Sequence, residues 1–100
     1  YGNVTLSARV FVGHDVFLCG NTFLGHECVI GDHCLLSVGN YLASDVNVGN
    51  CCYLGVGVMV RHQISIGDNC LIGMGTKIVK SISPNSKVIN RLETLITDNQ

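Results

Sequence analysis

The chain has 100 residues, enough for one domain, and a formal net charge of −1. Hydrophobic residues make up 47% of it and charged residues 13%, a composition that excludes disorder for most of the chain. The slightly negative net charge gives no indication of a surface that binds nucleic acid. No apolar stretch approaches the roughly 20 residues that a membrane-spanning helix needs, so we expect no membrane association.

An aliphatic residue stands at every sixth position from Leu6 to Ile78, without insertion or deletion. A Gly or another small residue usually follows it, and we expect Gly there because it tolerates the dihedral angles of a corner. A second short, mostly apolar residue comes four positions after each aliphatic. A strict period of six is typical of a parallel β-helix. Residues 1–83 are therefore expected to form three short strands per coil around stacked aliphatic ladders, with about eighteen residues per coil.

The repeat is expected to stop after Ile82. Residues 83–86 read Ser-Pro-Asn-Ser, which predicts a turn. Asn90 followed by Glu93 resembles a capping box, and apolar residues then recur at helical spacing, at Leu92, Leu95 and Ile96. Residues 84–100 are thus predicted to be a turn and a short C-terminal helix that caps the open end. At the other end the first coil presents unpaired strand edges, which a domain or a partner must cover.

Cysteines are numerous, and their number alone would indicate disulfides in a small secreted protein. Four of them occupy the second apolar position of the repeat, where a small buried residue is needed, at Cys28, Cys34, Cys52 and Cys70. Three of these fall in one column and cannot all pair, so we expect reduced thiols and a cytoplasmic protein. Asn40 occupies the same kind of position, and we expect it to hydrogen-bond neighbouring backbone rather than a ligand. No cysteine or histidine spacing typical of a zinc site is present.

The four histidines, His14, His26, His33 and His62, are all at outward-facing positions of the repeat. His26 and His62 share a column two coils apart, roughly 10 Å, which is too far for both to hold one metal ion within a subunit. A surface histidine is most often only a solvated side chain. His26 differs from the others in its neighbours.

Residues 26–31 read His-Glu-Cys-Val-Ile-Gly, within the stretch from Phe23 to Asp32, and residues 36–39 read Leu-Ser-Val-Gly. This stretch resembles the bacterial hexapeptide-repeat acetyltransferases that N-acetylate UDP-4-amino sugars, which are grouped with the sialic-acid O-acetyltransferases. The resemblance covers about residues 5 to 83 and implies that the β-helix is left-handed, against the usual right-handed rule for parallel crossovers. It also implies that His26 is the general base and that Glu27 raises its basicity.

The chemistry of such a histidine can be reasoned without the family. An amino group attacks a thioester only if its proton is removed as the new bond forms. An imidazole, with an ordinary pKa of about 6.5, suits this role at neutral pH. No serine or cysteine nucleophile is needed, because the amine attacks acetyl-CoA directly. The tetrahedral oxyanion then needs a hydrogen-bond donor such as a backbone N–H.

The resemblance places contacts to acetyl-CoA at Leu35, Val56 and Met74. Gly55 and Gly73 precede the last two and leave backbone free to bond the pantetheine arm. The family often has a histidine where this chain has Leu35, so this contact is not polar here. Three basic residues near the C-terminal end are candidates for the CoA phosphates: Lys77, Lys80 and Lys87.

The resemblance further implies a homotrimer with the acetyl-CoA cleft between adjacent rods, and the neighbouring rod could contribute Cys51, Tyr53 or His62. Relatives carry an N-terminal α/β domain that holds the nucleotide of the sugar, and this chain shows none. Either that domain lies upstream of Tyr1 or the acceptor is held differently. Residues 87–90 also depart from the family, which usually has Gly-x-Pro-Ala near this end. We expect N-acetylation of a nucleotide sugar, with O-acetylation and the identity of the sugar left open.

Two other functions use the same kind of rod. A γ-carbonic-anhydrase-like metalloenzyme would bind zinc or iron through three histidines shared between subunits, two of them spaced His-x4-His. His26 and His33 are seven positions apart, so this spacing is missing, and we expect no metal. The second alternative is a non-catalytic rod that serves as a scaffold, which would not bind acetyl-CoA.

Overall fold

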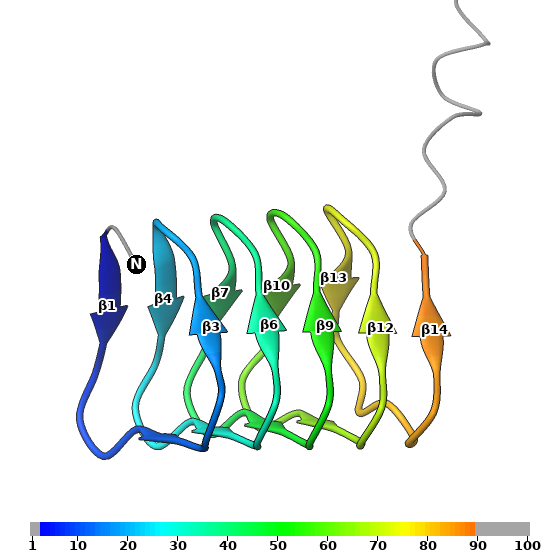
Figure 1. Ribbon diagram of the computed structural model, residues 1–100, viewed down its shortest axis with the longest axis horizontal. Coiled ribbons are helices and arrows are strands. Elements are labelled where there is room, and N and C mark those ends of the chain that lie inside the picture. The colour runs from blue at the N-terminus through cyan, green and yellow to red at the C-terminus, as the bar shows by residue number, and fades with distance from the viewer. Residues whose placement is uncertain (1–2, 90–100) are drawn as a thin grey trace, which may run out of the picture.

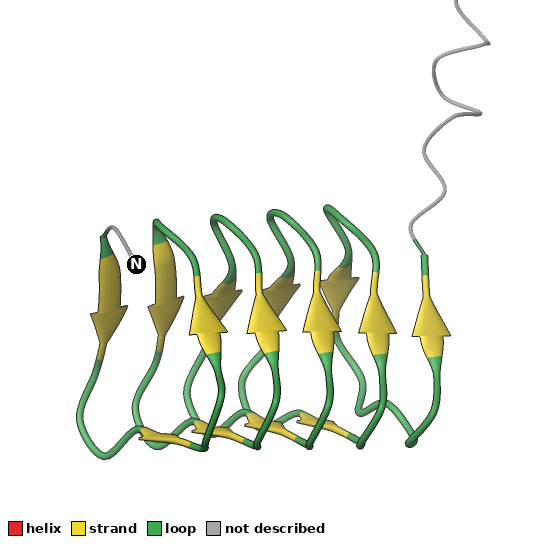
Figure 2. Ribbon diagram, in the orientation of Figure 1, coloured by secondary structure: helices red, strands yellow, loops and turns green. Residues whose placement is uncertain are grey.

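A computed structural model describes residues 3–89, and the coloured part of Figure 2 consists of short strands joined by turns. The first sheet contains β1 (Val4–Leu6), β4 (Thr22–Leu24), β7 (Tyr41–Leu42), β10 (Met59–Val60) and β13 (Lys77–Ile78). The second contains β2 (Phe11–Val12), β5 (Val29–Ile30), β8 (Asn47–Val48) and β11 (Ser65–Ile66). The third contains β3 (Phe17–Leu18), β6 (Leu35–Leu36), β9 (Tyr53–Leu54), β12 (Leu71–Ile72) and β14 (Lys87–Val88).

Every strand pairs in parallel with the strand one coil away, as in the pairing of Phe17 with Leu35 and of Phe11 with Val29. In Figure 1 the chain descends along the rear first sheet, comes forward along the bottom and rises along the front third sheet while it advances from left to right. The coils therefore wind in a left-handed sense. These observations confirm the predicted all-β hexapeptide-repeat β-helix. Within the described residues, no helix is long and apolar enough to cross a membrane.

The core is the set of aliphatic ladders that the period of six predicts. Each sheet contributes one column of buried side chains, and the fully buried members include Leu24, Ile30, Leu36, Leu42, Leu54 and Ile72. The second apolar positions fill the three corners with smaller side chains, among them Cys28, Val46 and Val58. Because each side chain lies over its counterpart in the next coil, burial depends on neighbouring coils. The end coil shows this, since Leu6 in β1 is 49% exposed.

We name the corners by the sheets that they join. The first corner leads from the first sheet to the second, the second corner from the second to the third, and the third corner from the third back to the first. At the second corner the side chains of Asp32, Asn50 and Asp68 each accept a hydrogen bond of 2.8 Å from a backbone N–H of the preceding coil. Each such bond contributes about 1 kcal/mol and holds adjacent coils together.

The glycines that follow the aliphatic residues have a different role from the expected one. They do not have left-handed dihedral angles. Instead a Cβ at Gly25 would lie 2.8 Å from the backbone carbonyl carbon of Ala43 in the next coil, and a Cβ at Gly49 would lie 2.8 Å from the backbone nitrogen of Asp68. Close stacking of the coils, and not dihedral freedom, therefore favours glycine at these positions.

Left-handed dihedral angles occur two positions later, in the turns themselves. The third corner has glycine there after its first turn, with φ of 74° at Gly39, and Asn21 in the first turn. The first and second corners use other residues, with φ of 62° at Glu27 and 59° at His33. A non-glycine residue in this region carries a cost of about 1–2 kcal/mol. Because the equivalent positions of neighbouring coils share this conformation, it belongs to the solenoid and is not specific to one site.

The C-terminal end differs from the prediction. The repeat does not stop after Ile82, because β14 adds one more strand to the third sheet. Leu71 pairs with Lys87 and Ile66 bridges to Ile82, so this coil is two residues shorter than the others. The predicted turn is present at residues 84–85. The predicted C-terminal helix falls on residues 90–100, which lie outside the described residues.

All six cysteines are free, and four of them are buried. The thiols of Cys34 and Cys52 each donate to a backbone carbonyl oxygen of the next coil at 3.1 Å, and burial raises the pKa of the Cys28 thiol. These side chains act as small core residues.

Asn40 is the one buried residue whose side chain is left partly unsatisfied among those that the structure describes. It is 1% exposed, and its Nδ2 donates to the Gly55 carbonyl oxygen at 2.7 Å, as expected for a residue that bonds to backbone. Its Oδ1 has no hydrogen-bond partner. One coil earlier, the Thr22 hydroxyl makes the equivalent bond to the Ser37 carbonyl oxygen at 3.1 Å and leaves no amide oxygen behind.

The substitution Asn40→Thr should therefore stabilise the fold. It removes a buried unpaired acceptor and keeps a donor for Gly55, so we expect an increase of about 1 kcal/mol in the free energy of unfolding. Chemical denaturation measures this, with Asn40→Asp as a control that should destabilise because it buries a charge. An Asn40→Thr protein that unfolds more easily than the wild type would contradict the assignment.

Candidate functional site

His26 lies at the first corner, immediately after the first sheet. β4 ends at Leu24, Gly25 allows the next coil to stack closely, and His26 and Glu27 then form the turn before β5. The inward direction at this turn is filled by Cys28, which is fully buried. The His26 side chain therefore faces outward and is exposed.

A groove of about 350 Å³ runs along the first corner beside His26. We call it the histidine groove, and its lining residues are Ser7, Phe23, Gly25, His26, Tyr41, Ala43, Ser44, Asp45, His62 and Gln63. The small residues Ala43 and Ser44 belong to the middle coil. His26 lies one coil before them and His62 one coil after them, so two imidazoles face one groove across a coil of small residues.

A second groove of about 310 Å³ adjoins the first toward the C-terminal coils. We call it the basic groove, and it is lined by Tyr41, Ala43, Met59, Val60, Arg61, His62, Lys77, Ile78 and Val79. The two grooves share Tyr41, Ala43 and His62. A smaller hollow of about 180 Å³ continues beyond it past Lys77 and Lys80. Mostly apolar walls with cations at one end suit a ligand that has an apolar arm and an anionic end.

The outer face of the first sheet adds an aromatic wall to the grooves. Phe23 in β4 and Tyr41 in β7 are paired across the sheet, and their rings stack with centroids 5.1 Å apart and an interplanar angle of 12°. Met59 and Lys77 continue the same column in β10 and β13. These side chains form an apolar wall beside the polar groups of the histidine groove.

Glu27 interacts first with Arg9 of the preceding coil. Arg9 Nε donates to Glu27 Oε2 at 2.8 Å, and Arg9 Nη2 lies 2.7 Å from the same oxygen. The hydrogen bond from Arg9 lowers the pKa of Glu27, and a hydrogen bond with Asp45 and the charge of His26 act in the same direction. Glu27 does not line the histidine groove. Its carboxylate is held ionised beside His26, and its predicted effect on the base stays a prediction.

The residues predicted to contact the cofactor lie on another part of the rod. Leu35 faces outward from β6 in the third sheet, and Val56 and Met74 are exposed at the third corner. The third corner precedes each strand of the first sheet, and the first corner follows it. Gly55 and Gly73 stand at the start of the third corner, where a Cβ at Gly55 would lie 2.8 Å from the backbone nitrogen of Met74. Within one chain these residues do not meet His26.

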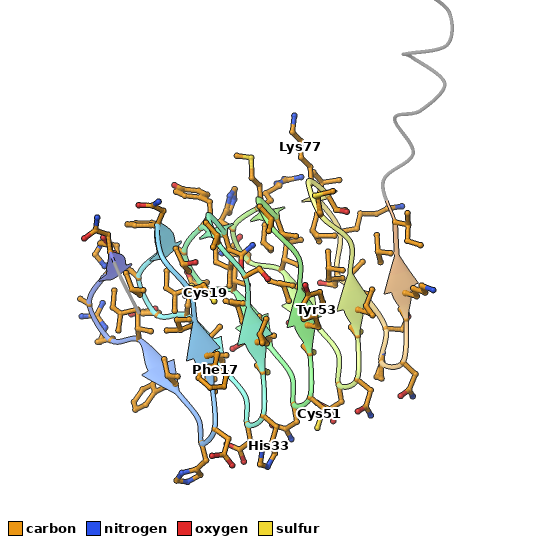
Figure 3. The ribbon with its side chains drawn as sticks, turned by 45° about the horizontal axis from the view of Figure 1, so that its top comes forward. Phe17, Cys19, His33, Cys51, Tyr53 and Lys77 are labelled. Atoms are coloured by element: carbon orange, nitrogen blue, oxygen red, sulfur yellow. The ribbon has the colours of Figure 1, made fainter. Side chains whose placement is uncertain are left out.

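The remaining candidates are divided between the faces. In Figure 3, Lys77 projects from the upper edge, whereas His33 and Cys51 lie at the lower, second corner. His33 Nδ1 is 3.3 Å from Asp15 Oδ2, so this histidine belongs to a surface pair. Tyr53 is on the third sheet, where its hydroxyl lies 3.4 Å from the Ser37 hydroxyl. Lys87 is also on the third sheet, in β14, apart from the basic groove.

Sequence reasoning missed Tyr41, Asp45 and Arg61, which line the grooves. The signal that could have found them is the spacing of one coil, because Asp45 lies one coil after Glu27. Among residues 3–89, no group of three or more histidine, cysteine, aspartate or glutamate side chains is arranged to hold a metal ion.

The chain is similar to known proteins in its repeats and in its fold. Residues 45–80 match the family described as bacterial transferase hexapeptide (six repeats). No curated protein matches the chain. Serine acetyltransferase of Neisseria gonorrhoeae, solved with serine, superposes with a TM-score of 0.78 at 21% identity over 83% of this chain and 38% of that chain.

Two further solved structures are similar. Serine acetyltransferase isoform 3 of Entamoeba histolytica, solved with cysteine, has a TM-score of 0.75 at 19% identity over 95% of this chain and 40% of that one. PerB of Caulobacter crescentus, solved with CoA and GDP-perosamine, has a TM-score of 0.63 at 24% identity over 81% of this chain and 48% of that one. At these identities the likeness shows the fold, and this chain spans less than half the length of each.

The contact between Arg9 and Glu27 yields a prediction about titration. Replacing the guanidinium by the apolar side chain in Arg9→Met should raise the pKa of Glu27 toward its ordinary value, because the largest stabilising contact of the carboxylate is lost. The carboxyl ¹³C signal of Glu27, followed by NMR as pH falls, measures this. Arg61→Met, about three coils after Arg9, is the matched control and should leave the Glu27 titration unchanged. An unaltered titration in Arg9→Met would show that the ion pair does not form in solution.

Proposed function

We propose that the protein is an acetyl-CoA-dependent acetyltransferase that N-acetylates an amino group of a nucleotide sugar, with His26 as the general base. The observation that carries the proposal is the position of His26 at one end of two adjoining grooves whose other end is basic. That arrangement matches the two ligands of such a reaction. The match to transferase hexapeptide repeats and the fold of the solved acetyltransferases support the same class of activity.

The basic groove suits acetyl-CoA as the co-substrate. Its apolar walls fit a pantetheine arm, and Arg61 and Lys77 provide cations for the CoA phosphates. Lys80 lines the adjoining hollow and extends the basic end. Lys87 is on another sheet, so we no longer count it among the candidates for the CoA phosphates. PerB, which shares the fold, was solved in complex with CoA.

A homotrimer would reconcile the grooves with the predicted cofactor contacts. Within one rod, the first corner carries His26, while the third corner carries Val56 and Met74. If the first corner of one rod faces the third corner of the next, these residues line one cleft from two sides. Val56 and Met74 are exposed, with Met74 73% exposed, so they are available for such a contact.

The reaction then proceeds by direct attack. The acceptor nitrogen attacks the thioester carbonyl carbon, His26 takes the proton from that nitrogen, and the carbon–sulfur bond breaks to release CoA. His26 supplies proton transfer at neutral pH, an effect of about 10²–10⁴-fold on the rate. Glu27, kept ionised by Arg9, adds negative charge near the imidazolium that forms. This is the role that we propose for it.

The lining of the histidine groove favours an amino sugar over an amino acid as acceptor. Among residues 3–89, no lysine or arginine lines this groove to pair with the α-carboxylate of an amino acid, and the carboxylate of Asp45 would repel that group. The amine attacks in its neutral form, whose N–H can donate a hydrogen bond to Asp45, and a sugar can pack against the side chain of Tyr41. Both ligands of the reaction are cytoplasmic metabolites in this proposal, and the reduced core cysteines suit that compartment.

The substitution His26→Ala tests the function. In the purified protein, supplied with acetyl-CoA and a UDP-linked 4-amino sugar, we expect kcat to fall by about 10²–10⁴-fold, because general-base catalysis is lost. Release of the CoA thiol measures turnover, and mass spectrometry identifies the acetylated product. His14→Ala, at the second corner, is the matched control and should turn over like the wild type.

Turnover of His26→Ala near the wild-type rate would remove His26 from the mechanism. A wild-type protein that binds no acetyl-CoA in calorimetry would instead favour a scaffold. Stoichiometric zinc or iron in the purified protein would favour the metalloenzyme.

A further inference from the structure

His62 occupies the junction of the two grooves. It lines both the histidine groove and the basic groove, together with Tyr41 and Ala43. If acetyl-CoA lies in the basic groove and the acceptor in the histidine groove, the thioester and the amine meet where the grooves adjoin. Of the three shared residues, His62 and Tyr41 can donate a hydrogen bond from the side chain, and His62 lies one coil beyond the small Ser44.

The spacing of the two histidines fits a reacting centre between them. His26 and His62 occupy the same position of coils that are two apart, which is roughly 10 Å from the strand spacing. A base, an attacking nitrogen, a carbonyl oxygen and a donor, joined by three contacts of about 3 Å each, span about 9 Å. Ser44 lies between the two histidines and is small enough to leave this space open.

We propose that His62 donates a hydrogen bond to the carbonyl oxygen of the thioester and stabilises the oxyanion of the tetrahedral intermediate. The inference rests on the function proposed above and assigns a second imidazole to the same site. His62 acts on the oxygen and not on the nitrogen, because His26 faces the acceptor end and His62 the cofactor end.

The step is balanced without any further reactant. The nitrogen–carbon bond forms as the carbonyl π electrons move to oxygen, where the His62 N–H holds the charge. His26 takes the proton of the attacking nitrogen. The oxyanion then collapses, the carbon–sulfur bond breaks, and the leaving CoA thiolate takes the proton from His26, which restores the neutral base. His62 keeps its proton throughout and is not consumed.

Other polar residues of the groove are less suited to this role. Gln63 lines the histidine groove only, and the Asp45 carboxylate would repel an oxyanion. Arg61 lines the basic groove but not the histidine groove, which places it toward the phosphates. Tyr41 also lines both grooves and carries a donor, but its ring lies on the first sheet and stacks on Phe23. His62 is the shared donor that lies in the same column as His26, and we therefore assign the oxygen to it.

Two substitutions of His62 distinguish the effect of its hydrogen-bond donor from the effect of its side-chain shape. His62→Phe keeps a flat ring of similar size but has no N–H, whereas His62→Gln keeps an N–H donor. With acetyl-CoA and the UDP-linked 4-amino sugar, we expect His62→Phe to lower kcat by about 10²–10³-fold with the KM for acetyl-CoA unchanged. His62→Gln should recover at least a tenth of the wild-type kcat. His14→Ala is the control for loss of a surface histidine.

The outcomes distinguish this inference from the proposed function. A wild-type kcat in His62→Phe, with or without a rise in KM, would overturn the role of His62. The proposed acetyltransferase function would still stand in that case if His26→Ala lost activity. Equal losses in His62→Phe and His62→Gln would also overturn it, because the side chain would then matter by shape. A wild-type protein without any acetyl transfer would overturn both proposals.

Discussion

In-register parallel stacking, in which each residue lies over its counterpart one coil earlier, is the constraint on which the whole structure depends. Backbone bonds between coils and the side-chain bonds of Asp32, Asn50 and Asp68 hold this register. Close approach of the coils leaves no room for a Cβ at Gly25. In this register, side chains eighteen residues apart lie next to one another and form columns along the rod.

The candidate site is a consequence of these columns. The inward positions are committed to the core, so chemistry is confined to the outward face of the sheets and to the turns. At the first corner the column of His26, Ser44 and His62 alternates large, small and large side chains, and the gap becomes a groove. The neighbouring column of Phe23 and Tyr41 supplies an aromatic wall. The left-handed turn dihedrals at this corner, such as φ of 62° at Glu27, repeat from coil to coil and are not specific to the site.

The sequence predicted the fold well because a period of six leaves few structures that can bury its ladders. The sequence led us to explain Gly25 by dihedral freedom, which was wrong. The close approach of the next coil, which favours glycine there, cannot be read from residues that are neighbours in the sequence. Sequence reasoning also missed β14, because the shortened coil shifts the phase of the repeat by two residues. His26 was found by resemblance, but the grooves were not, since a groove depends on side chains eighteen positions apart. The contact of Arg9 with Glu27 could have been read from that same interval.

A crystal structure of the protein with bound CoA tests the central claim most directly. The account predicts that the CoA sulfur lies in the histidine groove between the imidazoles of His26 and His62, with the phosphates beside Arg61 and Lys77. The pantetheine arm would then follow the basic groove along the first corner. A sulfur bound away from His26, for example at the second corner, would contradict the account.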